Sequence, residues 1–390
     1  MDFYQKALAL QNESISYRRY LHMHPDPGSF EVATAKYISD RLSEFGVEHQ
    51  LLPCNAVIGY IRGDKPGKCV ALRADIDGLM TQDACNKPYQ SVNSGVAHAC
   101  GHDFHIAALL TAAKLLQEQK RALSGTVKLI FQHSEERPPS GAAMLVKDYA
   151  VMDGVDAIFA LHIMNVLDAG DICVQAGARM SGSMNFYVDV HGKGGHGATP
   201  NDCIDPILAS CAMIMNLQSI VSREMPPGEA VSITVGKIMG GTEHNSVAND
   251  THFDAAIKCL NADLRKPIKA SVHRILTTTA ETYRCSIDVK YTEFGPPLIN
   301  DAKLSALAER SAANQFGSEH VVNCPPWPVS EDFTKYLEKA PGVYAFLGGR
   351  NVEKGFILQN HHPAFDADES SLAVGAAAYA AFAYDFLEQN

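Results

Sequence analysis

The chain has 390 residues, enough for one very large domain or two ordinary ones. With 46% hydrophobic and 20% charged residues, its composition is that of a globular protein that can build sizeable cores. The formal net charge of -11 excludes nucleic acid and anionic membrane surfaces as favoured partners, because both repel a negatively charged protein.

From the two end segments of the sequence we expect neither a targeting signal nor a membrane span. The first residues lack a basic segment followed by an apolar stretch, so we expect no secretory signal and a cytoplasmic location. The longest apolar run, from Ala373 to Phe386, is too short to span a bilayer and predicts a packed C-terminal helix. The ten cysteines form no Cys-x-x-Cys pair, and we expect most of them to be buried thiols of a reducing compartment.

The first half of the chain predicts strands that alternate with helices. The predicted helices are Phe3 to His22, Glu31 to Phe45, Ile106 to Gln119 and Gly141 to Lys147. The predicted strands are Val57 to Ile61, Cys69 to Ala74, Thr126 to Phe131 and Ala157 to Leu161. This alternation indicates an α/β sheet with helices on both of its faces.

From about Ser183 the pattern changes to that of a smaller α+β domain. Its predicted elements are, in chain order, a strand Met184 to Val190, a helix Pro206 to Arg223, strands Ala230 to Ile238 and Thr251 to Leu260, a helix Leu264 to Tyr283 and a strand Cys285 to Tyr291. The order β-α-β-β-α-β is ferredoxin-like. We therefore predict one domain built from residues 1–182 and 295–390, with residues 183–294 inserted as a second domain.

Unusual polar residues follow the predicted strands of the larger domain. They are Asp75 and Asp77, Cys100, His102 and Asp103, Glu135 and Glu136, and His162. Because open α/β sheets bind ligands at the carboxyl edge of their strands, we expect these side chains to converge. Thiolate, imidazole and carboxylate together suit a divalent transition metal. Taken alone, Cys100 and His102 have two equally good explanations. They are either two metal ligands or a buried cysteine beside a surface histidine.

These motifs resemble the metallo-aminoacylase branch of the zinc-aminopeptidase-like amidohydrolases, which includes hippurate hydrolases, N-acetyldiaminopimelate deacetylases and indole-acetyl-amino-acid hydrolases. The resemblance covers nearly the whole chain, in order. The matching segments are His22-Met23-His24-Pro25, Leu72 to Asp77, His98 to His105, Glu135-Glu136, Leu161-His162, Gly194-Gly195-His196, Asp205-Pro206-Ile207, Ser222-Arg223-Glu224, Ser330 to Phe333 and His361-His362-Pro363. The resemblance implies a mixed-sheet α/β/α catalytic domain with an inserted ferredoxin-like lid and dimerisation domain.

The resemblance also implies a dinuclear metal site. Cys100 would bridge two divalent ions, since this branch has cysteine where other branches have a bridging aspartate. The other implied ligands are Glu136 and His361 for one ion, and His102 and His162 for the second. Zinc, manganese, cobalt and nickel all accept this donor set. Asp75, Asp77 and Asp103 would orient the metal ligands by hydrogen bonds without binding the ions themselves. Alternatively, they would serve as helix caps and salt-bridge partners.

Further roles carried over by the resemblance concern the reaction itself. Glu135 would be the general base. His196 would reach across a homodimer to stabilise the oxyanion, although its segment alone predicts only a glycine-rich turn. Asn245 matches a substrate-contacting asparagine. Arg223 could bind a substrate carboxylate, although an arginine at a helix end is more often structural.

The implied reaction is the hydrolysis of an N-acetyl or aromatic N-acyl amino acid, which releases a carboxylic acid and a free amino acid. The chain departs from the usual pattern beside the paired glutamates, at His133, Ser134 and Arg137. A dipeptidase, a carboxypeptidase or an aminobenzoyl-glutamate hydrolase would use the same site, so these alternatives stay open. A catalytically silent binding protein is a further alternative, which an intact Glu135 argues against.

Overall fold

A computed structural model describes residues 1–389, and this part of the chain divides into two compact units. The first unit contains Met1–Gly177, Ile299–Pro325 and the segment from Lys335 onward. The second unit contains Ala178–Leu298 and Pro326–Thr334. We had placed the boundaries after residues 182 and 294, so they differ by a few residues. The segment 326–334, which we had placed with the larger domain, groups with the second unit.

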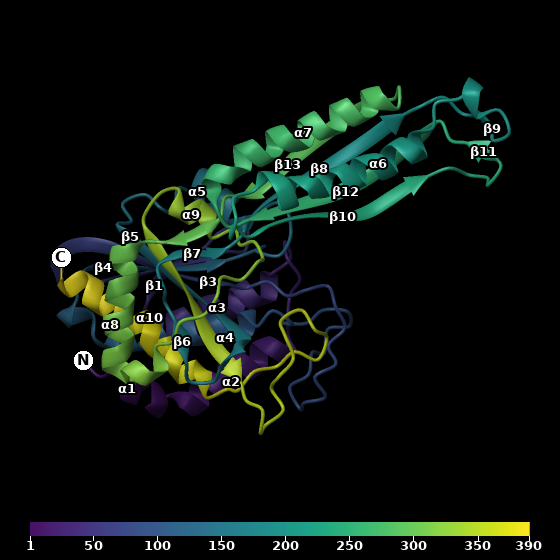
Figure 1. Cartoon of the computed structure of the whole chain (residues 1–390). Helices are drawn as coiled ribbons and strands as arrows, with labels where there is room; N and C mark the ends of the chain where they lie inside the picture. The colour runs from purple at the N-terminus through teal and green to yellow at the C-terminus, as the bar shows by residue number, and fades with distance from the viewer. Residues whose placement is uncertain (390) are drawn as a thin grey trace. The chain divides into compact units, whose positions relative to one another are not determined.

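A seven-stranded mixed sheet forms the centre of the first unit (Figure 1). Its strands, in spatial order, are β1 (Glu48–Leu51), β2 (Val57–Arg62), β4 (Ser124–Gln132), β3 (Lys65–Asp75), β5 (Ala157–Asp168), β15 (Gly342–Arg350) and β6 (Ile172–Cys173). The four central strands are parallel, and the pairs at both edges are antiparallel. The central strands are apolar and almost entirely buried where they pair, as parallel strands covered on both faces are. The predicted mixed α/β class is confirmed.

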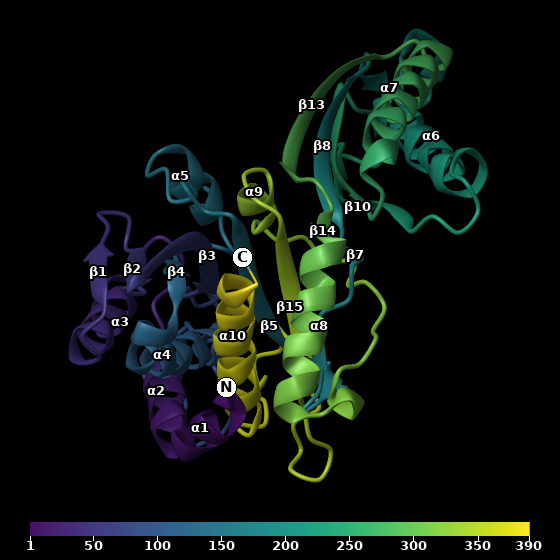
Figure 2. The ribbon, with the colours of Figure 1, turned by 90° about the vertical axis from the view of Figure 1, so that its left-hand side faces the viewer.

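The helices of the chain outside the inserted segment lie around this sheet; several contact its strands, and the two N-terminal ones pack on other helices. These helices are α1 (Phe3–Ala9), α2 (Gln11–Met23), α3 (Val32–Glu44), α4 (His102–Glu118), α5 (Gly141–Lys147), α8 (Ala302–Phe316), α9 (Thr334–Leu337) and α10 (Ser371–Glu388). Figure 2 shows α4 and α10 side by side, and both pack on β3. Gly375 permits this close approach, because a Cβ there would lie 3.2 Å from the Cβ of Ala108.

Two predictions of element boundaries in the first unit are wrong. The helix predicted from Phe3 to His22 is divided into α1 and α2 at Leu10, whose φ and ψ of -98° and 7° leave the helical region. The strand predicted to end before His162 continues to Asp168. It continues because β15, which the sequence pattern did not predict, pairs with β5 along this extension.

The second unit contains the inserted four-stranded sheet and two helices. Its elements are β8 (Gly182–His191), α6 (Pro206–Ser219), β10 (Val231–Gly240), β12 (Asp250–Cys259), α7 (Arg265–Thr282) and β13 (Ser286–Gly295). The sheet order β10-β12-β8-β13, antiparallel throughout, is the ferredoxin-like order. The inward residues of the strands and one face of each helix form a separate apolar core. A short ribbon pairs β9 (Gly195–His196) with β11 (Ser246–Val247), and β7 (Gly177–Met180) pairs with β14 (Leu298–Asn300).

All ten cysteines are free thiols. The prediction that most of them are buried is wrong, because only Cys100, Cys173, Cys203 and Cys259 are. Cys211, on α6, is exposed.

None of the helices within residues 1–389 combines the length and apolar character that crossing a membrane requires.

Candidate metal centre

Parallel strands bring candidate ligands to one edge of the first unit's sheet. β3 ends at Asp75, beside Gln132 at the end of β4. β3 pairs with β5 only as far as Ala160, so His162 lies just beyond this pairing. Although His162 is inside its strand, it therefore stands at the carboxyl edge of β3 and β4, where α/β sheets bind ligands.

Gly101 makes the tight turn that connects Cys100 to His102, the first residue of α4. Its φ of +90° lies in the left-handed region, which favours glycine. A Cβ at this position would lie 2.2 Å from Cγ2 of Ile163. Both the conformation and the space therefore require glycine, and the turn lets the side chains on either side of it face one centre.

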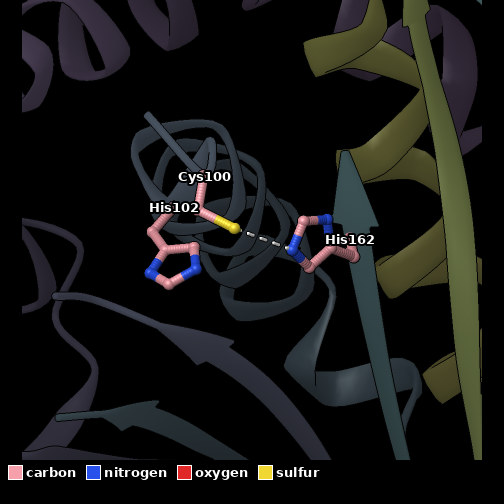
Figure 3. A group of neighbouring side chains, drawn as sticks. All are labelled: Cys100, His102 and His162. Atoms are coloured by element: carbon pink, nitrogen blue, oxygen red, sulfur yellow. Dashed lines mark hydrogen bonds between the residues drawn. The ribbon is translucent and has the colours of Figure 1, made fainter. Parts of the chain in front are cut away.

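Cys100, His102 and His162 form a buried group of donors (Figure 3). The Sγ atom of Cys100 lies 3.3 Å from Nε2 of His162. Figure 3 shows this sulfur directed at the His162 ring, with the His102 ring beside it. One donor atom from each residue lies within 4.8 Å of the other two, which is close enough for all three to bind one ion.

Cys100 also belongs to a second group of donors, with Glu136 and His361. Nε2 of His361 lies 3.1 Å from Oε1 of Glu136. The backbone of His361 has a φ of +70° and donates its N–H to the carbonyl of Ala99 at 2.7 Å, which fixes this loop beside Cys100. A cysteine shared by two donor groups has the arrangement of a bridging ligand.

Neighbouring acceptors set the orientation of the two buried imidazoles. Nδ1 of His102 faces the carbonyl oxygen of Asp77 at 2.8 Å, and Nδ1 of His162 faces the carbonyl oxygen of Ile163 at 2.7 Å. With Nδ1–H donating to a carbonyl, each ring presents the lone pair of Nε2 to the cluster. The backbone N–H of Glu136 donates to Oδ2 of Asp77 at 3.1 Å, so Asp77 supports residues of both donor groups.

The charges of the site fit a divalent transition metal. Burial, together with Glu136 and Glu135, raises the pKa of the Cys100 thiol well above its usual value. Burial lowers the pKa of His102, yet the carboxylates around it raise that pKa to about 10. Nε2 of His102 is buried and has no hydrogen-bond partner among the described residues. A cation would stabilise the thiolate and engage this nitrogen, and the mixed donor set is that of zinc and related ions.

Asp75 supports the cluster through a histidine to which we assigned no role from the sequence. Nδ1 of His105 lies 2.5 Å from Oδ1 of Asp75, and Nε2 of His105 accepts the N–H of Ile163 at 2.8 Å. Burial opposes ionisation of Asp75, but Arg73 and the nearby histidines hold its pKa well below the usual value. The available signal was the spacing of His105, which lies three residues after His102 on the same helix.

Asp103, the third carboxylate that we expected near the ligands, contacts a different set of residues. Its Oδ2 lies 2.7 Å from Nε of Arg18 and 2.8 Å from Nδ1 of His22.

Of the two neighbouring histidines at the C-terminal loop, His362 accepts the N–H of Ala364 on its Nδ1. This leaves His361 as the one that approaches Glu136.

We expect Asp77→Ala to weaken metal binding about 10–100-fold, because the Glu136 N–H loses its carboxylate acceptor. Competition against a chromophoric chelator measures this affinity. Asp64→Ala, which removes an exposed carboxylate just before β3, is the matched control and should bind metal normally. Equal affinities in the two variants would show that Asp77 does not support the ligands.

The remaining predicted site residues belong to the second unit. His196 on β9 pairs with Ser246 on β11, and the N–H of Gly197 donates to the carbonyl of Asn245 at 2.8 Å. The short ribbon therefore places His196 and Asn245 next to each other, far apart as they are in sequence, and both side chains are exposed. Arg223 is exposed in the helical turn Ile220–Glu224 that follows α6.

Comparisons with known proteins extend over both units. Residues 71–385 match the model of Peptidase family M20/M25/M40. Thermostable carboxypeptidase 2 of Saccharolobus solfataricus is 36% identical, with 95% of each chain covered. N-acetyl-L-cysteine deacetylase of Bacillus subtilis is 35% identical over 93% of this chain and 85% of that protein. The crystal structure of a dinuclear metal binding peptidase from Bacillus subtilis has a TM-score of 0.86 and 31% identity, covering 98% of this chain and 99% of its own.

Proposed function

Because the chain belongs to peptidase family M20/M25/M40 and is a metal-dependent amidohydrolase, we propose that it cleaves the amide bond of an N-acyl amino acid. The observation that carries this proposal is the pair of donor groups that share Cys100. Their ligand set matches a site for two divalent ions. In this assignment Cys100 would be a ligand of both ions, Glu136 and His361 would hold one, and His102 and His162 would hold the other.

Glu135 is the proposed general base. One of its carboxylate oxygens lies within 4.8 Å of donor atoms of both His102 and Glu136, and the residue is 8% exposed. Divalent ions bound here would supply Lewis acidity and a lowered pKa for water. Glu135 takes the proton of the attacking water and then passes it to the departing nitrogen, which leaves as the free amino acid.

The second unit is proposed to provide a lid and a dimer contact. His196, with Asn245 beside it on the same ribbon, would donate a hydrogen bond to the oxyanion from the partner subunit. Arg223 would bind the substrate carboxylate. A surface for dimerisation is available on this unit, because β10 is an edge strand with Ile238 and Met239 about half exposed.

We expect Met215→Glu to dissociate this homodimer. Leu208, Cys211 and Met215 lie on one stripe of α6, and the exposed fractions of Leu208 and Met215 are 54% and 71%. Because α6 contacts β10, the proposed dimer surface would include this stripe. A charge placed in it would be unpaired in the dimer, so we expect dimerisation to weaken at least about tenfold. Sedimentation velocity measures the change. Met80→Glu, at a methionine of the first unit that is 63% exposed, should leave the mass unchanged.

A monomeric wild-type protein with full activity would contradict the role of His196 from the partner subunit. It would not affect the assignment of the metal ligands, because all of these ligands belong to the first unit.

The substrate class is tested by initial rates on a panel of N-acetyl amino acids, N-benzoyl amino acids, aminobenzoyl-glutamate and dipeptides. Metal-stripped protein is assayed alone and after zinc, manganese, cobalt or nickel is added back. We expect metal-dependent release of free amino acid from the N-acyl substrates. The carboxypeptidase name of one relative makes peptide cleavage the second candidate, which preferential turnover of dipeptides would support. No turnover with any metal would support a silent binding homologue.

We also propose a cytoplasmic location. The ten free thiols support this, because disulfides are rare in reducing compartments. Cell fractionation followed by detection of the native protein tests it.

A further inference from the structure

A second cluster of metal-ligating side chains lies outside the two donor groups of Cys100. It consists of His22 at the end of α2, with Asp83 and Cys85 from the loop that follows β3. One donor atom from each residue lies within 4.8 Å of the other two. None of the three belongs to the ligand set assigned above.

His22 is oriented as a metal-binding imidazole is. Its Nδ1 lies 2.8 Å from Oδ2 of Asp103 and 3.2 Å from Nη2 of Arg18, and with a proton on Nδ1 the ring donates to that carboxylate. Its Nε2 is buried, has no hydrogen-bond partner among the described residues, and lies 3.3 Å from Oδ2 of Asp83. A carboxylate behind one ring nitrogen, with the lone pair of the other facing a second acid and a thiol, is typical of metal-bound histidine.

The loop that contains Asp83 and Cys85 is held in a fixed shape. The backbone N–H of Cys85 donates to Oδ1 of Asp83 at 2.9 Å, and that of Ser91 donates to Oδ2 at 2.7 Å. The Sγ atom of Cys85 lies 3.6 Å from Oδ2 of Asp83. Sγ of Cys85 and Nε2 of His22 therefore both lie beside Oδ2 of Asp83.

The two distances match the edges of a tetrahedral zinc site. Bonds of about 2.0–2.1 Å to nitrogen and oxygen, at roughly 109°, separate those two atoms by about 3.3 Å. Replacing the nitrogen by sulfur, with a bond of about 2.3 Å, lengthens the edge to about 3.5–3.6 Å. The observed nitrogen–oxygen and sulfur–oxygen distances are 3.3 Å and 3.6 Å.

The local charge also favours a cation. Three buried carboxylates, Asp83, Asp103 and Asp366, surround His22 and its neighbours. Among residues 1–389, Arg18 is the one buried guanidinium that contacts this group, and it pairs with Asp103 and Asp366 and lies beside His22. The carboxylates therefore outnumber the guanidinium, and a further positive charge beside Asp83 would be stabilised in this low-dielectric region.

We infer that His22, Asp83 and Cys85 bind a further divalent ion of the zinc type, with water as the fourth ligand. This ion joins the end of α2 to the loop that contains Asp83 and Cys85. Its role is structural, and it is separate from the ions of the Cys100 centre.

The test counts zinc in the full-length protein after equilibration in a zinc-buffered solution, by elemental analysis. We expect about three ions per chain in the wild type and about two in Cys85→Ala. Cys54→Ala, at another partly buried cysteine, is the matched control and should keep about three. Circular dichroism checks that each variant is folded. Equal zinc contents in the wild type and Cys85→Ala would overturn the inference, and His22 would then be an imidazolium between Asp103 and Asp83.

A second measurement separates this site from the Cys100 centre. In a Cys100→Ser background, cobalt added in place of zinc should still give a thiolate-to-cobalt absorption band, and Cys85→Ala should abolish it. Absence of the band in Cys100→Ser alone would overturn the inference. If the wild type gives the same band as Cys100→Ser, no cobalt binds through Cys100, so the inference stands and the dinuclear proposal fails.

Discussion

Glu135→Gln is expected to lower kcat about 10²–10⁴-fold while the metal content stays at the wild-type value. The amide keeps the size of the glutamate side chain but cannot accept the proton of the attacking water. Because Glu135 is assigned to proton transfer and is not a ligand, both ions should remain bound. Initial rates on the best N-acyl substrate, with elemental analysis of the same sample, measure both quantities.

The neighbouring residue provides the matched control. Glu136→Gln changes the same atoms one position along the chain, but Glu136 belongs to the donor group with Cys100 and His361. We expect this variant to lose metal, and to recover part of its activity when excess metal is added. If Glu135→Gln loses metal and Glu136→Gln keeps it, the two roles are exchanged. If both variants keep metal and full activity, the proposed mechanism is wrong.

The parts of the site that could be predicted are those with a local signal. Asp75 ends an apolar strand and the pair Glu135–Glu136 lies three and four residues after the end of another, and such residues meet at the carboxyl edge of a parallel sheet. Cys100 and His102 flank a glycine, which indicates a tight turn. The family resemblance drawn from these motifs is confirmed by the match over residues 71–385.

The parts that could not be predicted depend on contacts between distant segments. The extension of β5 past His162 exists because β15 pairs with it, and those strands are far apart in sequence. His361 is predicted only through the family resemblance, because its placement requires a left-handed backbone at a histidine, for which the sequence contains no local signal. Similarly, Asp103 adjoins the ligand His102 in sequence, yet its carboxylate pairs with Arg18 from α2.

Arg18 is expected to contribute most to stability among the charged residues of α2. Its guanidinium is buried and lies 2.7 Å from Oδ2 of Asp103 and 2.6 Å from Oδ1 of Asp366. It also lies over the rings of Tyr89 and Phe104, at 4.8 Å and 4.5 Å from their centroids. Arg18→Met removes the positive charge and leaves two carboxylates buried without it, so we expect the free energy of unfolding to fall by about 3–5 kcal/mol.

Arg19→Met is the matched control for this effect. Arg19 is the next residue on the same helix, and it pairs with Glu369 at 2.6 Å, but about half of its side chain is exposed. Water screens an exposed pair, so we expect a loss below about 1 kcal/mol. Urea denaturation followed by circular dichroism compares the two variants under identical metal conditions. Equal losses would mean that burial does not distinguish the two arginines. A large loss confined to Arg18→Met would show that its buried ion pairs hold α2 to α4, the helix that begins at the ligand His102.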